Sequence, residues 1–192
     1  FLLPLLIVTA VSASQPELRL KQAHAQQTLA QFTLLDFKFD TLKTSGTSRS
    51  TVLQPVFNSG LALDAAGAPH LPRAVFILGV PQGARANATA QPLRVEELYD
   101  IDLAPVATYK DSLFHYTRDE KIYAQDRFYP QEIVVVESPS QFRDQTIVRV
   151  EIAPLQYNPV TRVLRIIHEM QITVNHAGAV ANAPVSLETS PV

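Results

Sequence analysis

The segment from Phe128 to Val174 constrains the fold more than any other, because its side chains alternate, break off and resume in a dense pattern. Residues 133–136 form a short β-branched run that indicates a strand. Residues 146–152 alternate between apolar and charged side chains, which predicts a strand with one buried face. Residues 164–174 continue this alternation and predict a long amphipathic strand. The turn-forming residues between the last two strands predict a hairpin, and they are Pro154, Asn158 and Pro159.

Length and composition favour one domain built from strands. The chain has 192 residues, enough for a domain that buries about 70% of its unfolded surface. Hydrophobic residues make up 46% of it, and its 14 prolines suit short strands and turns better than long helices. We therefore predict an all-β fold, an antiparallel β-sandwich of roughly eight strands. The predicted domain extends over residues 16–174.

Several classes of function fit the sequence poorly. A net charge of −2 gives no reason to attract nucleic acid or an acidic membrane surface. The chain has no Cys, which excludes a thiol nucleophile, and no Gly-x-Ser-x-Gly motif or Gly-rich phosphate loop. Its five histidines show no metal-ligand spacing, so neither a metal site nor a cofactor is expected. His168 falls on the apolar side of its strand, where a hydrogen-bonded core or edge histidine is expected rather than a catalyst.

The two ends of the chain differ in composition from its centre. Residues 1–13 form an apolar run that ends in small residues, typical of a partial signal peptide. The run is too short to span a membrane, and the alternative is a buried first strand. Residues 175–192 have the composition of a linker toward a further domain. We therefore expect an exported protein, secreted or at the cell surface, with no membrane attachment once the signal is removed.

The central segment also carries a family resemblance. Its landmarks are Tyr129-Pro130, Arg143, Pro154, Gln156-Tyr157-Asn158-Pro159, Leu164 and Ile166. Upstream, Gly67-Ala68-Pro69-His70-Leu71-Pro72 precedes an apolar strand that ends in Val80-Pro81. Together these residues resemble the amino-terminal propeptide of gingipain-type cysteine peptidases. The resemblance implies a jelly-roll-like β-sandwich, and it covers roughly residues 56–174.

The resemblance also implies a function. It predicts a non-catalytic propeptide, not an enzyme, which binds its cognate cysteine peptidase catalytic domain, keeps the peptidase latent by covering its active site, and assists its folding. Peptidases of this family cleave after Arg or Lys, and a propeptide residue of that kind can occupy the specificity pocket. Arg118 and Lys121 are the candidates for this inhibitory loop, by position and charge, within a segment rich in aromatic and basic residues.

Two alternatives stay open. The aromatic residues between Tyr109 and Phe128 can instead pack on the sandwich as an ordinary surface loop. The whole chain can instead be an extracellular β-sandwich module for binding or adhesion, which would share the signal peptide and the fold without needing a peptidase. No Lys or Arg follows Arg165, so an Arg- or Lys-specific enzyme has no cleavage point within residues 175–192. Release by such an enzyme would use a site beyond Val192 or a cut in the loop that holds Arg118 and Lys121.

Overall fold

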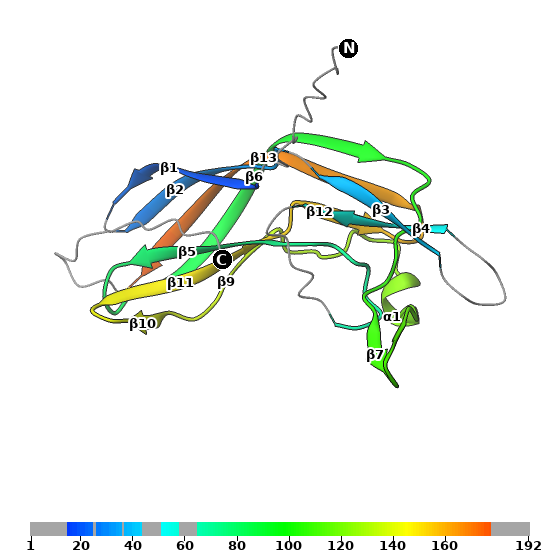
Figure 1. Cartoon of the computed structure of the whole chain (residues 1–192). Helices are drawn as coiled ribbons and strands as arrows, with labels where there is room; N and C mark the ends of the chain where they lie inside the picture. The colour runs from blue at the N-terminus through cyan, green and yellow to red at the C-terminus, as the bar shows by residue number, and fades with distance from the viewer. Residues whose placement is uncertain (1–14, 25, 36, 44–50, 58–64, 178–192) are drawn as a thin grey trace, which may run out of the picture.

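The structure, a computed structural model, describes residues 15–177 except for 25, 36, 44–50 and 58–64. Two antiparallel sheets pack face to face, which confirms the predicted all-β sandwich (Figure 1). The first sheet contains β1 (Glu17–Ala23), β2 (Gln27–Thr33), β6 (Arg85–Leu98), β12 (Leu155–Asn158) and β13 (Val163–Ala177). The second contains β5 (Ala74–Val80), β9 (Val134–Val136), β10 (Ser140–Phe142) and β11 (Gln145–Ile152).

The long strand β13 is the centre of the first sheet. Along one edge it pairs with β6, and along the other it pairs first with β12 and then with β2. In the second sheet β11 lies between β5 on one side and the two short strands β9 and β10 on the other. The core fills the space between the sheets, where Phe32 of β2 meets Phe76 of β5 edge to face at 6.2 Å between ring centroids.

The apolar side chains of β11 are buried as predicted, but the strands that pair with β11 are not those expected. Val148, Val150 and Ile152 are 0%, 1% and 0% exposed. The predicted hairpin between this strand and residues 164–174 is wrong, because β11 pairs with β5, β9 and β10. At the buried Ala153-Pro154 step the chain crosses to the other sheet and begins β12, which forms the hairpin with β13. The turn was predicted correctly, and the strand preceding it was not.

The placement of His168 on the apolar face of β13 is also wrong. The register with β6 shifts between Ile167 and Glu169, which is a β-bulge. The bulge puts Ile167 into the core at 0% exposure, whereas His168 hydrogen-bonds through its Nε2 to Glu96 Oε2 of β6 at 2.8 Å. His168 is therefore a hydrogen-bonded histidine beside the edge strand, in agreement with the prediction that it has a structural role.

Smaller elements complete the described residues. They are the hairpin of β3 (Lys38–Lys43) and β4 (Thr51–Val56), the hairpin of β7 (Thr108–Lys110) and β8 (Leu113–His115), and the one-turn helix α1 (Glu120–Tyr123). Within the described residues, no helix is long and apolar enough to cross a membrane. The predicted signal peptide, residues 1–13, and residues 178–192 of the predicted linker lie outside the described residues.

Candidate functional site

Residues 107–127, which we call the projecting segment, extend away from the sandwich (Figure 1). Their hairpin turns at Asp111 and Ser112, whose φ angles of 52° and 64° are both left-handed, as in the turns that match strand twist in tight hairpins. Its strands expose large apolar side chains: Tyr109 at 66%, Leu113 at 63% and Phe114 at 66%. The rings of Tyr109 and Phe114 pack on each other at 5.1 Å. This hairpin therefore presents an aromatic surface, the composition that anchors protein interfaces.

Arg118, the first candidate residue, follows this hairpin and is held in place. Its Nη2 forms a short ion pair with Asp102 Oδ1, and its guanidinium lies 4.9 Å from the centre of the Tyr123 ring. The side chain is still 43% exposed. Burial raises the pKa of the Tyr123 phenol, and the nearby Arg118 only partly opposes this effect. Arg118 is thus an oriented cation over a neutral aromatic ring.

Lys121, the second candidate residue, lies in α1 and is exposed. Its backbone N–H donates to Asp119 Oδ1 at 2.8 Å, so that Asp119 caps the helix. Among the described residues, no carboxylate forms an ion pair with its ammonium group. The two candidates therefore lie close together in the chain on one projecting segment, but Arg118 has an internal partner and Lys121 is open to a new one.

The Gln-Tyr-Asn-Pro motif anchors the two ends of the projecting segment to the first sheet. Tyr157 is 2% exposed and donates its hydroxyl to Ile101 O at 2.8 Å. Gln156 Nε2 donates to Pro130 O at 2.8 Å, and the backbones of Tyr129 and Tyr157 exchange two hydrogen bonds of 2.8 Å. Burial raises the pKa of Tyr157, so its hydroxyl keeps the proton that this contact uses. The motif thus fixes the chain just before and just after the projecting segment.

Asn158 and Pro159 complete the motif at the turn into β13. Asn158 Oδ1 accepts from the backbone N–H groups of Val160 and Thr161 at 3.1 and 3.2 Å, an arrangement by which Asn initiates turns. Its Nδ2 donates to Asp126 Oδ1 at 2.8 Å. The same side chain therefore shapes the turn and holds the last residues of the projecting segment. Pro154, the remaining motif residue, is buried where the chain changes sheets.

Gly67, in the second landmark of the resemblance, supports the middle of the projecting segment. Its φ of 88° is left-handed, and a Cβ there would lie 3.0 Å from both Thr117 O and Asp119 N. The carbonyl of Gly67 accepts from Asp119 N at 2.9 Å. A larger residue would push away the backbone that carries Arg118.

Four of the five histidines lie outside the projecting segment, and His115 is the last residue of its strand β8. Within the described residues, no group of three or more His, Cys, Asp or Glu side chains is placed to hold a metal ion. His176 is 4% exposed and its Nε2 lies 2.8 Å from Thr28 Oγ1, while His70 Nε2 lies 3.1 Å from Gln54 Nε2. These contacts suit structural side chains.

The sequence indicated that the projecting segment forms a surface, but it did not reveal the hairpin within it. The aromatic and basic composition of residues 109–128 indicated a surface, whereas the hairpin was missed because each of its strands has only three residues. The polar pair Asp111-Ser112 between two apolar-aromatic runs was the available signal. The pairing of Arg118 with Asp102 had no such signal, since it joins residues 16 apart that lie on either side of this hairpin.

Comparison with known proteins identifies relatives of this chain. Gingipain R2 of Porphyromonas gingivalis is 28% identical over 179 residues, covering 90% of this chain and 24% of the relative. Gingipain R1 of the same organism is 29% identical over 168 residues, covering 83% of this chain and 16% of the relative. The chain therefore spans about a quarter or less of the length of the curated relatives it matches.

Two solved structures share the fold. One is a complex of the pro- and mature domains of P. gingivalis RgpB, with 27% identity, a TM-score of 0.73, and coverage of 91% of this chain and 93% of that chain. The other concerns the zymogenic latency of gingipain K from the same organism, with 19% identity, a TM-score of 0.69, and coverage of 86% and 95%. At its lower identity the second likeness shows the fold alone.

The family follows from a match over most of the chain. The sequence model of the Propeptide_C25 family matches residues 10–186. The relatives are matched over their propeptide region and not over a catalytic domain. The chain belongs to the Propeptide_C25 family and is a propeptide domain of the gingipain type, as the resemblance predicted.

Proposed function

We propose that this chain keeps a secreted, gingipain-like cysteine peptidase latent by covering the active site of its catalytic domain, and that it assists the folding of that domain. The observation that carries the proposal is the similarity to a propeptide that was solved in complex with its mature domain. An interface of standard size, about 1,600 Å², can inhibit strongly without any chemistry. Attachment within one precursor would add a high effective concentration.

The projecting segment is the proposed contact surface. Tyr109, Leu113 and Phe114 supply exposed apolar area, and the cations beside them supply charge for an acidic specificity pocket. Lys121 can enter such a pocket directly, because it is exposed and has no ionic partner among the described residues. Arg118 would have to exchange Asp102 for a carboxylate of the peptidase, in charge-assisted hydrogen bonds of the same kind.

Inhibition of a mature gingipain by the isolated chain tests the proposal. The double variant Arg118→Ala, Lys121→Ala is expected to bind at least about tenfold more weakly, a loss of about 1.4 kcal/mol. The double variant Arg19→Ala, Lys21→Ala removes the same charge from β1, at the other end of the molecule, and should inhibit like the parent (Figure 1). Single variants then separate the exposed Lys121 from the paired Arg118.

Each outcome has a defined meaning. If both double variants inhibit like the parent, the proposed cations do not contact the peptidase, and the next residues to replace are Arg85, Lys110 and Arg127. If the parent itself does not inhibit at micromolar concentration, latency through this domain is wrong, and the alternative of a binding or adhesion module gains support. The folding role predicts a higher refolding yield of the catalytic domain when the chain is present, with the two double variants as the comparison.

A further inference from the structure

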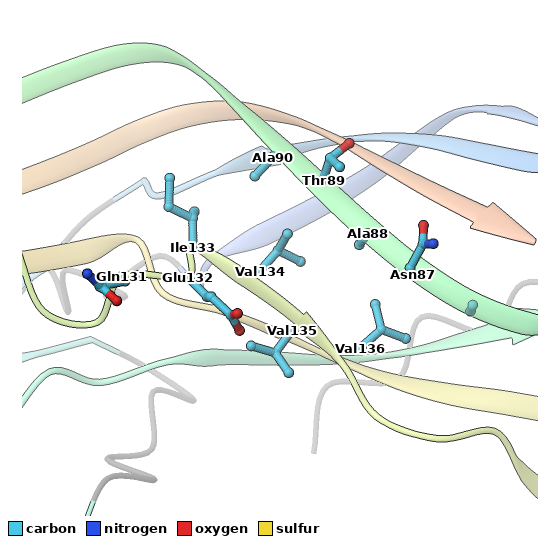
Figure 2. A pocket seen from close by; sticks show the side chains of 11 residues that line it. Asn87, Ala88, Thr89, Ala90, Gln131, Glu132, Ile133, Val134, Val135 and Val136 are labelled. Atoms are coloured by element: carbon cyan, nitrogen blue, oxygen red, sulfur yellow. The ribbon is translucent and has the colours of Figure 1, made fainter.

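A groove opens between the two sheets on the side where β6 and β9 face each other (Figure 2). Its volume is about 520 Å³, and its apolar lining includes Ala86, Ala88, Ala90, Ile133, Val134 and Val136. All six of these side chains pack against the core but are only partly buried. The alanines of β6 are too short to cover the valines opposite, so the hydrophobic core reaches the surface here.

Both walls of the groove are open strand edges. Within the described residues, β6 pairs only with β13 and β9 only with β11, so each has one edge without a strand partner. Figure 2 shows Ile133, Val134 and Val136 directed toward β6, whereas Val135 points away from it. An open edge beside apolar side chains is a site where an extended segment can add backbone hydrogen bonds and insert alternate side chains.

The chain itself supplies a suitable segment next to the groove. β13 ends at Ala177, which pairs with Arg85, directly before the first alanine of the groove wall. Residues 178–192 follow, and alternate positions there are apolar: Ala179, Ala181, Ala183, Val185 and Leu187. On the other side, Val180 and Pro184 are also apolar, whereas Asn182, Ser186 and Glu188 are polar. From Val185 to Glu188 the pattern is that of a strand with one buried face.

The distances permit this segment to reach the groove. Neighbouring strands lie about 4.8 Å apart, so passing around the end of β6 covers about 10 Å, which takes three or four extended residues at about 3.3 Å each. Residues from about Ala181 onward would then run beside β6 in the direction of Ala86 to Ala90. Val185 and Leu187 would lie against the valines of β9. Pro184 would be tolerated there, because the added segment would form the edge of the sheet.

We propose that residues 178–192 add an extended segment over this groove, with Val185 and Leu187 covering the exposed part of the core. The groove is thus a docking site for the chain's own carboxyl-terminal segment. The inference is independent of the peptidase, because it concerns contacts within the chain alone. Docking would fix the direction in which the chain leaves the domain.

Hydrogen exchange of the whole 192-residue chain, followed by mass spectrometry, tests the proposal. Amides of residues 178–192 should exchange at least about tenfold more slowly in the parent than in the double variant Val185→Asp, Leu187→Asp. The matched control Ser186→Asp adds charge on the opposite side of the segment and should keep the protection. Both sets of changes fall after Ala177, where the last described strand ends, so the fold of the sandwich is expected to persist, as a far-ultraviolet spectrum can verify.

A change in the groove tests the same contact from the other side. Ala88→Leu should fill the groove and release the segment, whereas Gln91→Leu, at an exposed position of β6 that is not part of the groove lining, should not. Exchange of residues 178–192 at the rate of an unstructured peptide in the parent overturns the proposal. Protection of the groove that rises with protein concentration, together with a dimer in light scattering, would instead assign the groove to a second copy. Protection that appears only when a mature peptidase is added would assign the groove to that partner.

Discussion

The contact between Asn158 and Asp126 permits a test of how the family motif holds the projecting segment. Asn158 is 6% exposed, and its Nδ2 donates to Asp126 Oδ1 at 2.8 Å. The substitution Asn158→Asp keeps the oxygen that accepts from Val160 N and Thr161 N, but it removes the donor and places a second carboxylate against the first. It therefore changes one contact and leaves the turn chemistry intact.

The expected cost follows from the two changes at this contact. A hydrogen bond to a charged group contributes about 1.5–3 kcal/mol, and two like charges about 4 Å apart repel by about 1 kcal/mol even in bulk water. We expect Asn158→Asp to lower the free energy of unfolding by about 3 kcal/mol at neutral pH. For a domain of this size that lowers Tm by about 6–12 °C.

Low pH should reverse the loss of stability in Asn158→Asp. The neighbouring carboxylate raises the folded-state pKa of the introduced group above its unfolded value, so the variant regains stability as the pH falls toward about 4. Once protonated, one carboxyl can donate to the other as the amide does in the parent. The parent should show no such recovery at this position.

A reversed pair provides the control for this prediction. Asp126→Asn combined with Asn158→Asp restores one amide and one carboxylate, and it should recover at least half of the lost Tm. Asn87→Asp adds the same charge on the exposed part of β6 and should change the free energy of unfolding by less than about 0.5 kcal/mol. If Asn158→Asp melts like the parent, or if the reversed pair melts as low as the single variant, the contact does not hold the segment.

Three further predictions concern the sandwich. Val150→Asp should unfold the domain, seen as loss of the β-type far-ultraviolet spectrum, because it buries an unpaired charge at a position 1% exposed. Pro159→Ala should cost less than about 1 kcal/mol in urea unfolding, mainly through a more flexible unfolded chain; equal tolerance of these two changes would contradict the assigned core face. Burial lowers the pKa of His176 below its ordinary 6.5, so the free energy of unfolding should fall as the pH drops below about 6.5, and less steeply in His176→Gln.

Strand positions could be predicted wherever the alternation was strong. Residues 146–152 form all but the first residue of β11, and residues 164–174 lie within β13. Alternation is a property of one strand and its two faces, so it is visible in the sequence alone. The strand partners are not, because β11 and β12 lie in different sheets although only Ala153 and Pro154 separate them.

Other parts of the fold could not be predicted from the sequence, because the local pattern of side chains does not determine them. The first half of β6 alternates alanine with polar residues, a pattern with little apolar contrast, yet it forms part of a 14-residue strand because β13 pairs with it along nearly its whole length. The bulge at Ile167 and Glu169 likewise depends on neighbouring strands, and it moved His168 off the buried face. Long-range pairing decided both cases, and the local sequence does not encode it.

The candidate site contains two kinds of residue: those that hold the projecting segment in place and those that can contact a partner. Gln156, Tyr157 and Asn158 are 5%, 2% and 6% exposed, so these motif residues cannot offer much surface to a peptidase. They hold the chain on either side of the projecting segment, where Lys121 is exposed. A motif variant should therefore weaken inhibition only together with a fall in Tm, whereas Lys121→Ala should weaken inhibition at unchanged Tm. Comparing the two quantities separates loss of the support from loss of the contact itself.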